Sequence, residues 1–180
     1  MKATGIVRRI DDLGRVVIPK EIRRTMRIRE GDPLEIYTTR EGEVIFKKYS
    51  LISGIEEFAG HICETLSKST GSIVAVADRD SIIALHGGAR RELMGKPVSE
   101  AMEEIMTGRS VYVRNAKDRP LYVTEGNERL FALVAAPILA EGDVLGLVLF
   151  VGDDPAKSGG ETEQKLAQTI ANFLGKHMEV

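Results

Sequence analysis

Arginine side chains are concentrated at the start of the sequence. Residues 1–29 hold nine Lys and Arg side chains against three Asp and Glu, and seven of the nine are arginine. The planar guanidinium group meets a phosphate or the edge of guanine with two parallel hydrogen bonds. A solvated charged face is the alternative interpretation, but such faces usually contain matching acids. This composition therefore predicts a surface that binds nucleic acid.

The charge of the remaining chain has the opposite sign. Residues 1–50 contain 12 Lys and Arg against 8 Asp and Glu, a net charge of +4, whereas residues 51–180 contain 13 against 19, a net charge of −6. A basic segment beside an acidic remainder indicates an anionic partner for the basic segment alone. We expect double-stranded DNA to be that partner.

Two residue types are missing from the basic segment. Residues 1–50 contain no Asn and no Gln, so the usual bidentate contact to adenine cannot come from this region. Recognition then depends on contacts from Arg to phosphate and to guanine, and on the bendability and groove width of the target. We expect a loose consensus sequence and binding that weakens steeply with salt.

The elements that must position these arginines are short. Residues 4–10 and 15–19 have strand-like patterns separated by a turn at Asp11, Asp12 and Gly14, and residues 20–26 form a short helix. Residues 33–39 and 43–49 are predicted as a hairpin with alternate side chains half-buried: Leu34, Ile36, Val44 and Phe46. A piece below about 60 residues buries too little apolar surface to fold alone. We therefore expect two copies to share one core.

Residues 51–180 change to a pattern of helices and strands. Apolar positions repeat at helical spacing from residue 52 to residue 66, and Gly71 ends that helix. Residues 99–108 form a second helix with Ser99 as N-cap, and residues 161–180 form a third. The predicted strands are residues 72–78, 81–87, 110–115, 120–125, 130–139 and 143–152. This order predicts an α+β domain with a central antiparallel sheet.

Few residues of the second part are candidates for chemistry. Cys63 lies among apolar helix positions and is interpreted as a buried structural thiol. The three histidines are too dispersed for a metal site, and a single cysteine leaves no zinc cluster. Met102 and Met106 could line an adaptable apolar pocket for a small-molecule effector, although methionines at helical spacing more often belong to a core. We expect no cofactor, no metal and no catalysis.

The chain shows no sign of a membrane or secretory address. No apolar run approaches the about 18 residues that a membrane-spanning helix needs, and the first residues lack the apolar core of a signal peptide. A single cysteine fits a reducing compartment. We expect a cytoplasmic protein without a membrane partner.

The basic segment resembles a known family. Its motifs TGIVR, LGRVVIP, EIRRT and LEIY are similar to those of the DNA-binding domain of the AbrB family of bacterial transition-state regulators, and the resemblance covers residues 1–50. It implies a swapped-hairpin β-rich dimer. It also implies DNA contacts from Arg8, Arg15, Arg23 and Arg24, with Lys2 and Arg9 in support.

The second part resembles a GAF domain, with a leading helix, the strands AAPI and GDVLGLVLF, and a closing helix. The combination of both parts is similar to a family of late-sporulation regulators of spore-forming bacilli. That resemblance implies a transcription regulator of forespore genes, acting as activator and repressor. It also implies dimers through residues 1–50 that join into tetramers through residues 51–180. Two other hypotheses remain, an antitoxin-like module that binds DNA and protein, and a small enzyme on the GAF-like fold.

Overall fold

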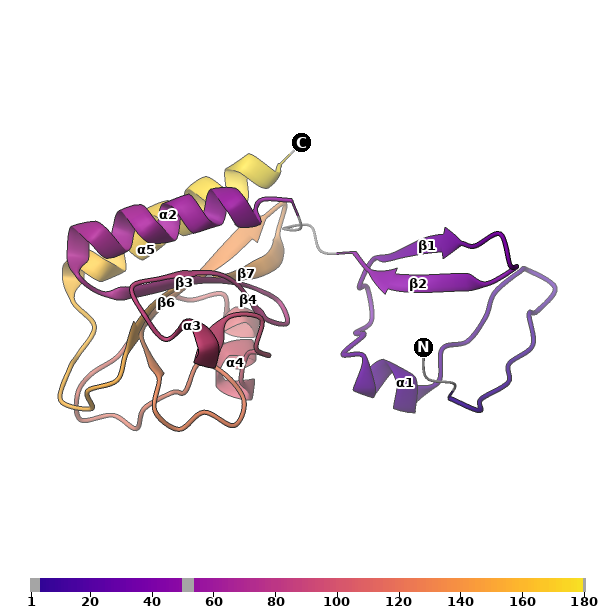
Figure 1. Ribbon diagram of the computed structural model, residues 1–180, viewed down its shortest axis with the longest axis horizontal. Coiled ribbons are helices and arrows are strands. Elements are labelled where there is room, and N and C mark those ends of the chain that lie inside the picture. The colour runs from indigo at the N-terminus through magenta and orange to yellow at the C-terminus, as the bar shows by residue number, and fades with distance from the viewer. Residues whose placement is uncertain (1–3, 50–53, 180) are drawn as a thin grey trace. The chain divides into compact units, whose positions relative to one another are not determined.

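The structure, a computed structural model, describes residues 4–49 and 54–179. Internal contacts divide the chain into two compact units, residues 1–49 and residues 50–180 (Figure 1). Each unit is described by itself.

The N-terminal unit contains one short helix and one hairpin. Helix α1 spans Lys20–Thr25 and follows Pro19, which suits a helix opening because the first turn needs no backbone N–H partner. Strands β1 (Leu34–Thr38) and β2 (Val44–Lys48) pair antiparallel, with Ile36 opposite Phe46. The turn between them closes through two hydrogen bonds, from the Thr39 amide to the Glu43 carbonyl at 3.0 Å and from the Gly42 amide back to the Thr39 carbonyl at 3.2 Å. Helix and hairpin both lie where the sequence predicts them.

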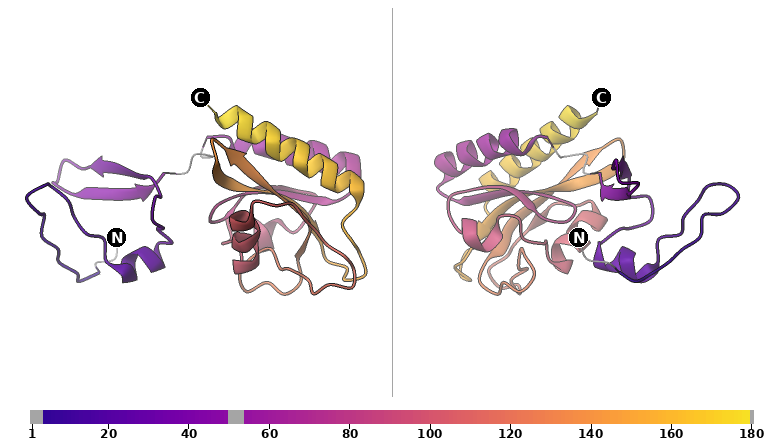
Figure 2. Two further views of the ribbon diagram at one scale, coloured as in Figure 1. Left: turned by 180° about the vertical axis from the view of Figure 1, so that it is seen from behind. Right: turned by 45° about the vertical axis from the view of Figure 1, so that its right-hand side comes forward.

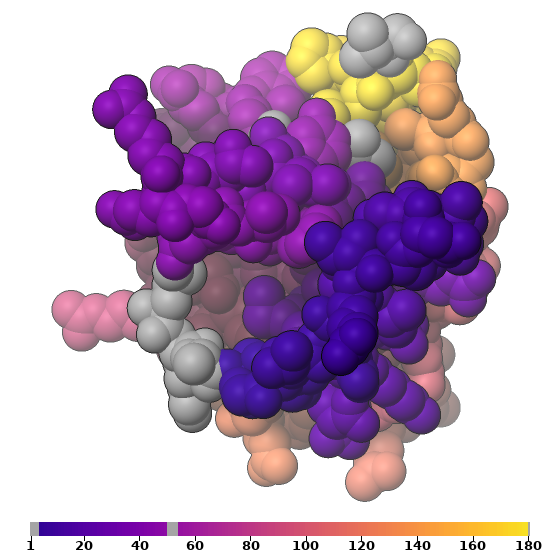
Figure 3. All heavy atoms as spheres, turned by 90° about the vertical axis from the view of Figure 1, so that its right-hand side faces the viewer, coloured from indigo at the N-terminus to yellow at the C-terminus, as the bar shows by residue number. Residues whose placement is uncertain are grey.

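The first residues of this unit differ from the prediction. Residues 4–18 contain no helix or strand, only a turn around residues 12–14, although strands were predicted over residues 4–10 and 15–19. A strand needs a neighbour with which to exchange backbone hydrogen bonds, and the hairpin of the same chain does not provide one. The space-filling view in Figure 3 shows this indigo segment at the surface of the unit.

The hairpin of this unit is largely uncovered. Of the four positions predicted to be half-buried, Leu34 is half-buried, whereas Ile36 is 61% exposed, Val44 59% and Phe46 40%. Pro19 is the only buried side chain among residues 4–49. The reason is geometric, because one helix and two strands from a single chain cannot enclose a core.

The C-terminal unit is built on a five-stranded antiparallel sheet in the order β4-β3-β7-β6-β5. Strands β6 and β7 form its long central hairpin, with Ala136 opposite Val148. The strands are β3 (Ile73–Asp78), β4 (Ile82–His86), β5 (Tyr112–Val113), β6 (Phe131–Ala140) and β7 (Asp143–Gly152). The helices are α2 (Glu56–Thr70), α3 (Arg90–Leu93), α4 (Glu100–Gly108) and α5 (Glu161–Met178). The predicted α+β fold with a central antiparallel sheet is confirmed.

Both faces of this sheet are covered. Helices α2 and α5 lie side by side on one face, as Figure 2 shows, and they bury Cys63 and Leu174 against Val134 and Phe150. The opposite face is covered by α3, α4 and the connecting loops, with Met102 and Leu93 packed against Leu147. These two layers form the core of the unit.

Local signals in this unit largely agree with the sequence. Gly71 ends α2 at φ +71°, and its amide donates to the Ser67 carbonyl at 2.8 Å. The Ser99 side chain caps α4 by accepting from the Met102 amide at 3.3 Å. Two predictions were wrong in extent, and one element was missed. The strand predicted over residues 110–115 shrinks to Tyr112–Val113, residues 120–125 make only isolated bridges, and the short helix α3 was not predicted.

Helix α5 approaches β6 very closely at one point. A Cβ atom added to the buried Gly175 would lie 2.0 Å from the Leu139 carbonyl oxygen. Only glycine allows the helix backbone to come this near to the strand.

Across residues 4–49 and 54–179, the helices are too short or too polar for any of them to cross a membrane.

Candidate nucleic-acid interface

Arg15 is held by a turn that the sequence predicted. The Asp11 carboxylate accepts hydrogen bonds from the Leu13 amide at 3.0 Å, from the Arg15 amide at 2.7 Å and from Arg15 Nε at 2.8 Å. These bonds, led by the one from the Arg15 amide, lower the pKa of Asp11. Gly14 adopts φ +76°, which its lack of a side chain permits. The turn therefore fixes the backbone of Arg15 and leaves its side chain 70% exposed.

Arg23 and Arg24 project from the last turn of α1. Both are exposed, and neither forms an ion pair with a residue that the structure describes. Below them the chain leaves the helix in a tight turn, with the Ile28 amide donating to the Arg23 carbonyl at 2.7 Å and Arg27 at φ +51°. The helix thus presents to solvent two guanidinium groups that have no ion-pair partner in the described part of the chain.

Arg8 and Arg9 lie in the segment before the turn. Both are exposed, and within residues 4–49 neither has an ion-pair partner. Val7 and Ile10, which flank them, are 86% and 68% exposed. Lys2, the remaining predicted contact, lies outside the described residues. Five predicted side chains therefore stand in one unit, divided between the N-terminal segment and α1.

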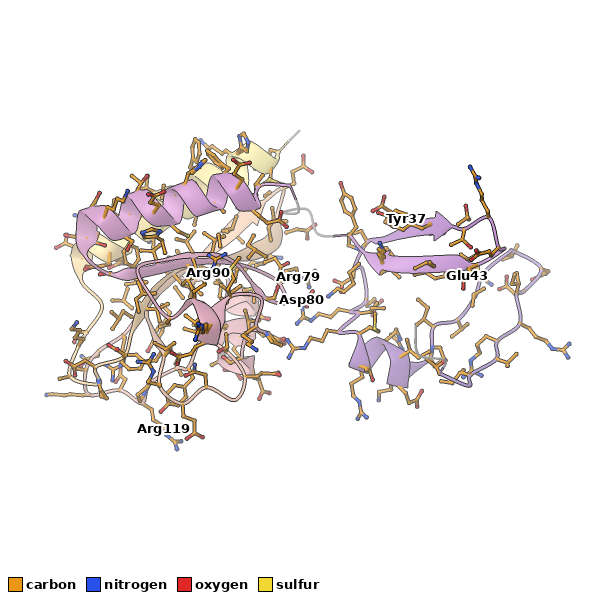
Figure 4. The ribbon with its side chains drawn as sticks, in the orientation of Figure 1. Tyr37, Glu43, Arg79, Asp80, Arg90 and Arg119 are labelled. Carbon is orange, nitrogen blue, oxygen red and sulfur yellow. The ribbon has the colours of Figure 1, made fainter. Side chains whose placement is uncertain are left out.

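The hairpin adds a cation that the sequence analysis did not name. Lys47 Nζ lies 4.6 Å from the centre of the ring of Tyr37, a residue that is labelled on β1 in Figure 4. The Tyr37 hydroxyl donates to Glu35 at 2.5 Å. That hydrogen bond raises the pKa of Tyr37. Lys47 stands opposite Glu35 in the register of the hairpin, so these opposite charges in the two predicted strands are the signal that could have found it.

Lys48 connects the hairpin to the helix. Its ammonium group donates to the Arg27 carbonyl at 2.8 Å and lies 3.7 Å from the Asp32 carboxylate. The same carboxylate accepts from the Arg29 amide at 2.8 Å. Lys48 therefore acts structurally, by fixing the segment that follows α1.

The candidates of the C-terminal unit lie in its interior. Met102 is fully buried and Met106 is 5% exposed, and both pack in the cluster with Leu93 and Leu147. Core packing accounts for both side chains, so a role for them in binding a ligand stays a prediction.

Cys63 is a buried thiol, as the sequence indicated. It is fully buried on α2, and this burial raises its pKa to about 12. A thiol in this state is a poor nucleophile at neutral pH. Among residues 4–49 and 54–179, no group of three or more His, Cys, Asp or Glu side chains could hold a metal ion.

Comparison with protein families divides the chain in the same way. Residues 54–179 match the family described as "Stage V sporulation protein T C-terminal, transcription factor". Residues 7–51 match the family described as "Antidote-toxin recognition MazE, bacterial antitoxin".

Two curated proteins of Bacillus subtilis (strain 168) are similar in sequence. Stage V sporulation protein T is 48% identical over 179 residues, which cover 99% of both chains. The transition state regulatory protein AbrB is 63% identical over 49 residues, which cover 27% of this chain and 50% of that protein.

Among solved structures, the GAF domain of an Acinetobacter phosphoenolpyruvate-protein phosphotransferase superposes with a TM-score of 0.52. It is 11% identical, over 71% of this chain and 85% of that chain. This likeness concerns the fold alone, and it shows that the C-terminal unit is GAF-like.

Proposed function

The chain belongs to the stage V sporulation protein T family of transcription factors, and from that premise we propose that residues 1–50 bind double-stranded DNA as a homodimer. The protein is a transcription factor and not an enzyme. The observation that carries the proposal is the set of exposed arginines on a unit that is 63% identical to part of AbrB.

Dimerisation is proposed because the N-terminal unit exposes the side chains that should form its core. Val7, Val17, Ile36 and Val44 are between 59% and 86% exposed. A second copy that supplies neighbouring strands would bury these side chains and give residues 4–18 backbone partners. The result would be a shared, swapped-hairpin sheet.

The proposed contacts to DNA are Arg8, Arg15, Arg23 and Arg24, with Arg9 and Lys2 in support. The arginines 8, 9, 23 and 24 have no ion-pair partner among the described residues, and Arg15 is paired only with the exposed Asp11. A guanidinium group without a competing carboxylate is available to phosphate and to guanine. A dimer would present each contact twice.

The C-terminal unit is proposed to join two dimers into a tetramer. On the exposed side of α2 and α5, the ring centres of Phe58 and Phe173 lie 6.0 Å apart, and His177 lies within 6.2 Å of both. Phe58 and Phe173 are 36% and 49% exposed. Exposed aromatic side chains of this kind are enriched where subunits meet.

The same unit is proposed to sense a small-molecule effector in the layer between its sheet and α4, where Met102 and Met106 lie. The buried hydroxyl groups of Tyr112 and Thr124 have no hydrogen-bond partner among the described residues. A buried hydroxyl without a partner is costly, and a polar ligand or a water molecule would relieve that cost.

The family name and the relative from Bacillus subtilis support a role in late sporulation. We propose that the protein activates some forespore genes and represses others, and that it acts in the cytoplasm where the chromosome lies.

An antitoxin-like function is the second candidate, because residues 7–51 match an antitoxin family. It is less well supported, since residues 54–179 form a closed GAF-like unit that matches a transcription-factor family. An antitoxin of this type would need a segment that captures its toxin.

The test is fluorescence anisotropy of the full chain with duplex DNA. Each of Arg8→Ala, Arg15→Ala, Arg23→Ala and Arg24→Ala is expected to weaken binding about tenfold or more, and to reduce the slope of log affinity against log salt. Arg119→Ala, an exposed arginine of the C-terminal unit, is the matched control and should bind as the parent does. Circular dichroism verifies that each variant folds. Unchanged binding in all four variants contradicts the proposal.

A further inference from the structure

We infer that the C-terminal unit has a second binding site, for a small molecule with an apolar body and one anionic group, in a pocket between α5 and the edge of the sheet. This pocket has a volume of about 550 Å³, within the range of roughly 300–1,000 Å³ that is usual for small-molecule sites. Its lining is Arg109, Val111, Ala136, Pro137, Leu139, Lys165, Gln168, Thr169, Ala171 and Asn172.

The pocket exists because the edge strand, β5, is too short to cover the whole length of β6. β5 pairs with β6 only at Tyr112 opposite Ala135 and Val113 opposite Val134, whereas β6 continues to Ala140. Pro137 lies in this uncovered stretch and has no backbone N–H to offer a further strand. The edge is therefore unsuited to strand addition, and it is left open beside α5, the yellow helix in Figure 2.

Helix α5 faces the pocket with a polar stripe. Lys165, Gln168, Thr169 and Asn172 line it at the spacing i, i+3, i+4 and i+7, which places them on one side of a helix. The lining from the sheet side is apolar, with Val111, Pro137 and Leu139. The two walls together suit a molecule with one apolar side and one polar side.

The charges of the lining all have one sign. Arg109 and Lys165 are cationic, and no acid lines the pocket, although residues 51–180 carry six more acids than bases. Lys165 pairs with Glu161 at 2.6 Å, but these side chains are 72% and 79% exposed. An ion pair this exposed contributes little free energy. Arg109 is exposed and forms no ion pair with a described residue. Both cations are therefore able to accept an anionic ligand.

The backbone of Arg109 gives an independent reason to assign it a function. Arg109 follows the last residue of α4 and adopts φ +51°, a conformation that favours glycine. Unfavourable backbone conformations that persist cluster at functional sites. An arginine in such a position, in the lining of a pocket that no acid lines, indicates binding of an anion.

These features define the ligand by its chemistry. The guanidinium group of Arg109 and the ammonium group of Lys165 fit a carboxylate or a phosphate, the stripe on α5 offers further hydrogen bonds, and Leu139, 39% exposed, contacts the apolar body. The site is separate from the layer around Met102, because Ala136 and Ala171 belong to the core on the opposite face of the sheet.

The experiment is a methyl NMR titration of the full chain, followed at Val111 and Leu139, with octanoate, octyl phosphate and the uncharged octanamide. At least one of the two anions should cause saturable shifts and bind at least about tenfold more tightly than octanamide, since a hydrogen bond to a charged group is stronger than one to a neutral amide. Whichever anion binds more tightly identifies the head group.

Three variants test the assignment. Arg109→Gly keeps the backbone favourable and should weaken binding of the anion at least about tenfold, Lys165→Gln should weaken it by a smaller factor, and Lys176→Gln, on the same helix but outside the pocket, should leave it unchanged. No saturable shift with either anion, equal affinity for octanamide, or equal affinity of the parent and Arg109→Gly would overturn the proposal. The titration contains no DNA, so its failure leaves the proposed DNA-binding function intact.

Discussion

The two units of this chain differ in how far a single chain buries their apolar side chains. In the C-terminal unit both faces of the five-stranded sheet are buried, by α2 and α5 on one side and by α4 with its neighbours on the other. In the N-terminal unit Pro19 is the only buried side chain among residues 4–49, and large apolar residues such as Val7 and Val17 are exposed. The N-terminal unit has the apolar composition of a folded domain but lacks the buried contacts of one.

This difference shows that apolar residues in a sequence can indicate either a core within one chain or a surface that another chain covers. Burial of an apolar side chain is favourable, and the C-terminal unit buries its apolar side chains within one chain. The N-terminal unit leaves its apolar side chains exposed, and this exposure supports the proposal that a second copy covers them. Exposure of apolar side chains is therefore as informative here as burial.

The largest expected effect tests whether the core of the C-terminal unit is complete. Phe150→Ala should lower the free energy of unfolding of that unit by about 3–5 kcal/mol, because Phe150 is fully buried. Phe173→Ala, at 49% exposure, is the control and should cost much less in dilute solution. Urea denaturation followed by circular dichroism measures both. A similar loss in both variants would show that Phe173 is covered by another subunit under those conditions.

A second substitution tests whether the N-terminal unit is completed by a partner. Ile36→Lys should dissociate the proposed dimer, because burial of an isoleucine contributes about 1.5–3 kcal/mol in each copy. Glu35→Lys introduces the same side chain at the adjacent position, on the opposite face of the hairpin, and should leave the dimer intact. Analytical ultracentrifugation distinguishes the two. A dimer that tolerates Ile36→Lys would contradict a shared core at this face.

A third test uses the buried thiol of the C-terminal unit. The pKa of Cys63 is raised by burial to about 12, whereas an unfolded cysteine has a pKa of about 8.5. The folded state therefore keeps its proton at higher pH, so this contribution to stability is complete below about pH 8.5 and is lost as pH rises, by about 1.4 kcal/mol per pH unit. Urea denaturation at pH 8 and pH 10 should show a smaller fall for Cys63→Ala than for the parent. Equal falls would mean that the thiol is not shielded.

The smallest effect concerns the end of α4. Arg109→Gly should raise the free energy of unfolding by up to about 1 kcal/mol, because glycine adopts φ +51° without strain. Glu104→Gly, within the same helix, should instead lower it by about 1 kcal/mol. Thermal unfolding compares them. Destabilisation by Arg109→Gly would mean that the arginine side chain contributes contacts that exceed the backbone cost.

Much of the C-terminal fold was predictable because its signals are local. The hairpin of β6 and β7, the cap at Ser99 and the stop at Gly71 each depend on residues close in sequence, and each was confirmed. The predicted strand over residues 120–125 was wrong because its apolar residues are buried by loop packing rather than by a ladder, as at Val123. Apolar residues are buried both in a paired strand and in this loop, so a buried apolar pattern does not distinguish the two.

The candidate interface was predictable in composition but not in geometry. Arginine enrichment and the Asp11 turn could be seen in the sequence, and the structure places Arg15 on that turn. The strands predicted over residues 4–10 and 15–19 did not form, because their pairing depends on a neighbour that one chain lacks. The pocket beside α5 was missed, since it depends on where β5 ends relative to β6.

The close approach of α5 to β6 at Gly175 has a consequence for how this sequence can evolve. Gly175 cannot acquire even a methyl group, because the added Cβ atom would lie 2.0 Å from the Leu139 carbonyl oxygen. Leu139 also lines the pocket, so a larger residue at 175 would lift the helix and widen the pocket together. We therefore expect descendants of this chain to keep this glycine, or to change it only together with compensating changes around Leu139.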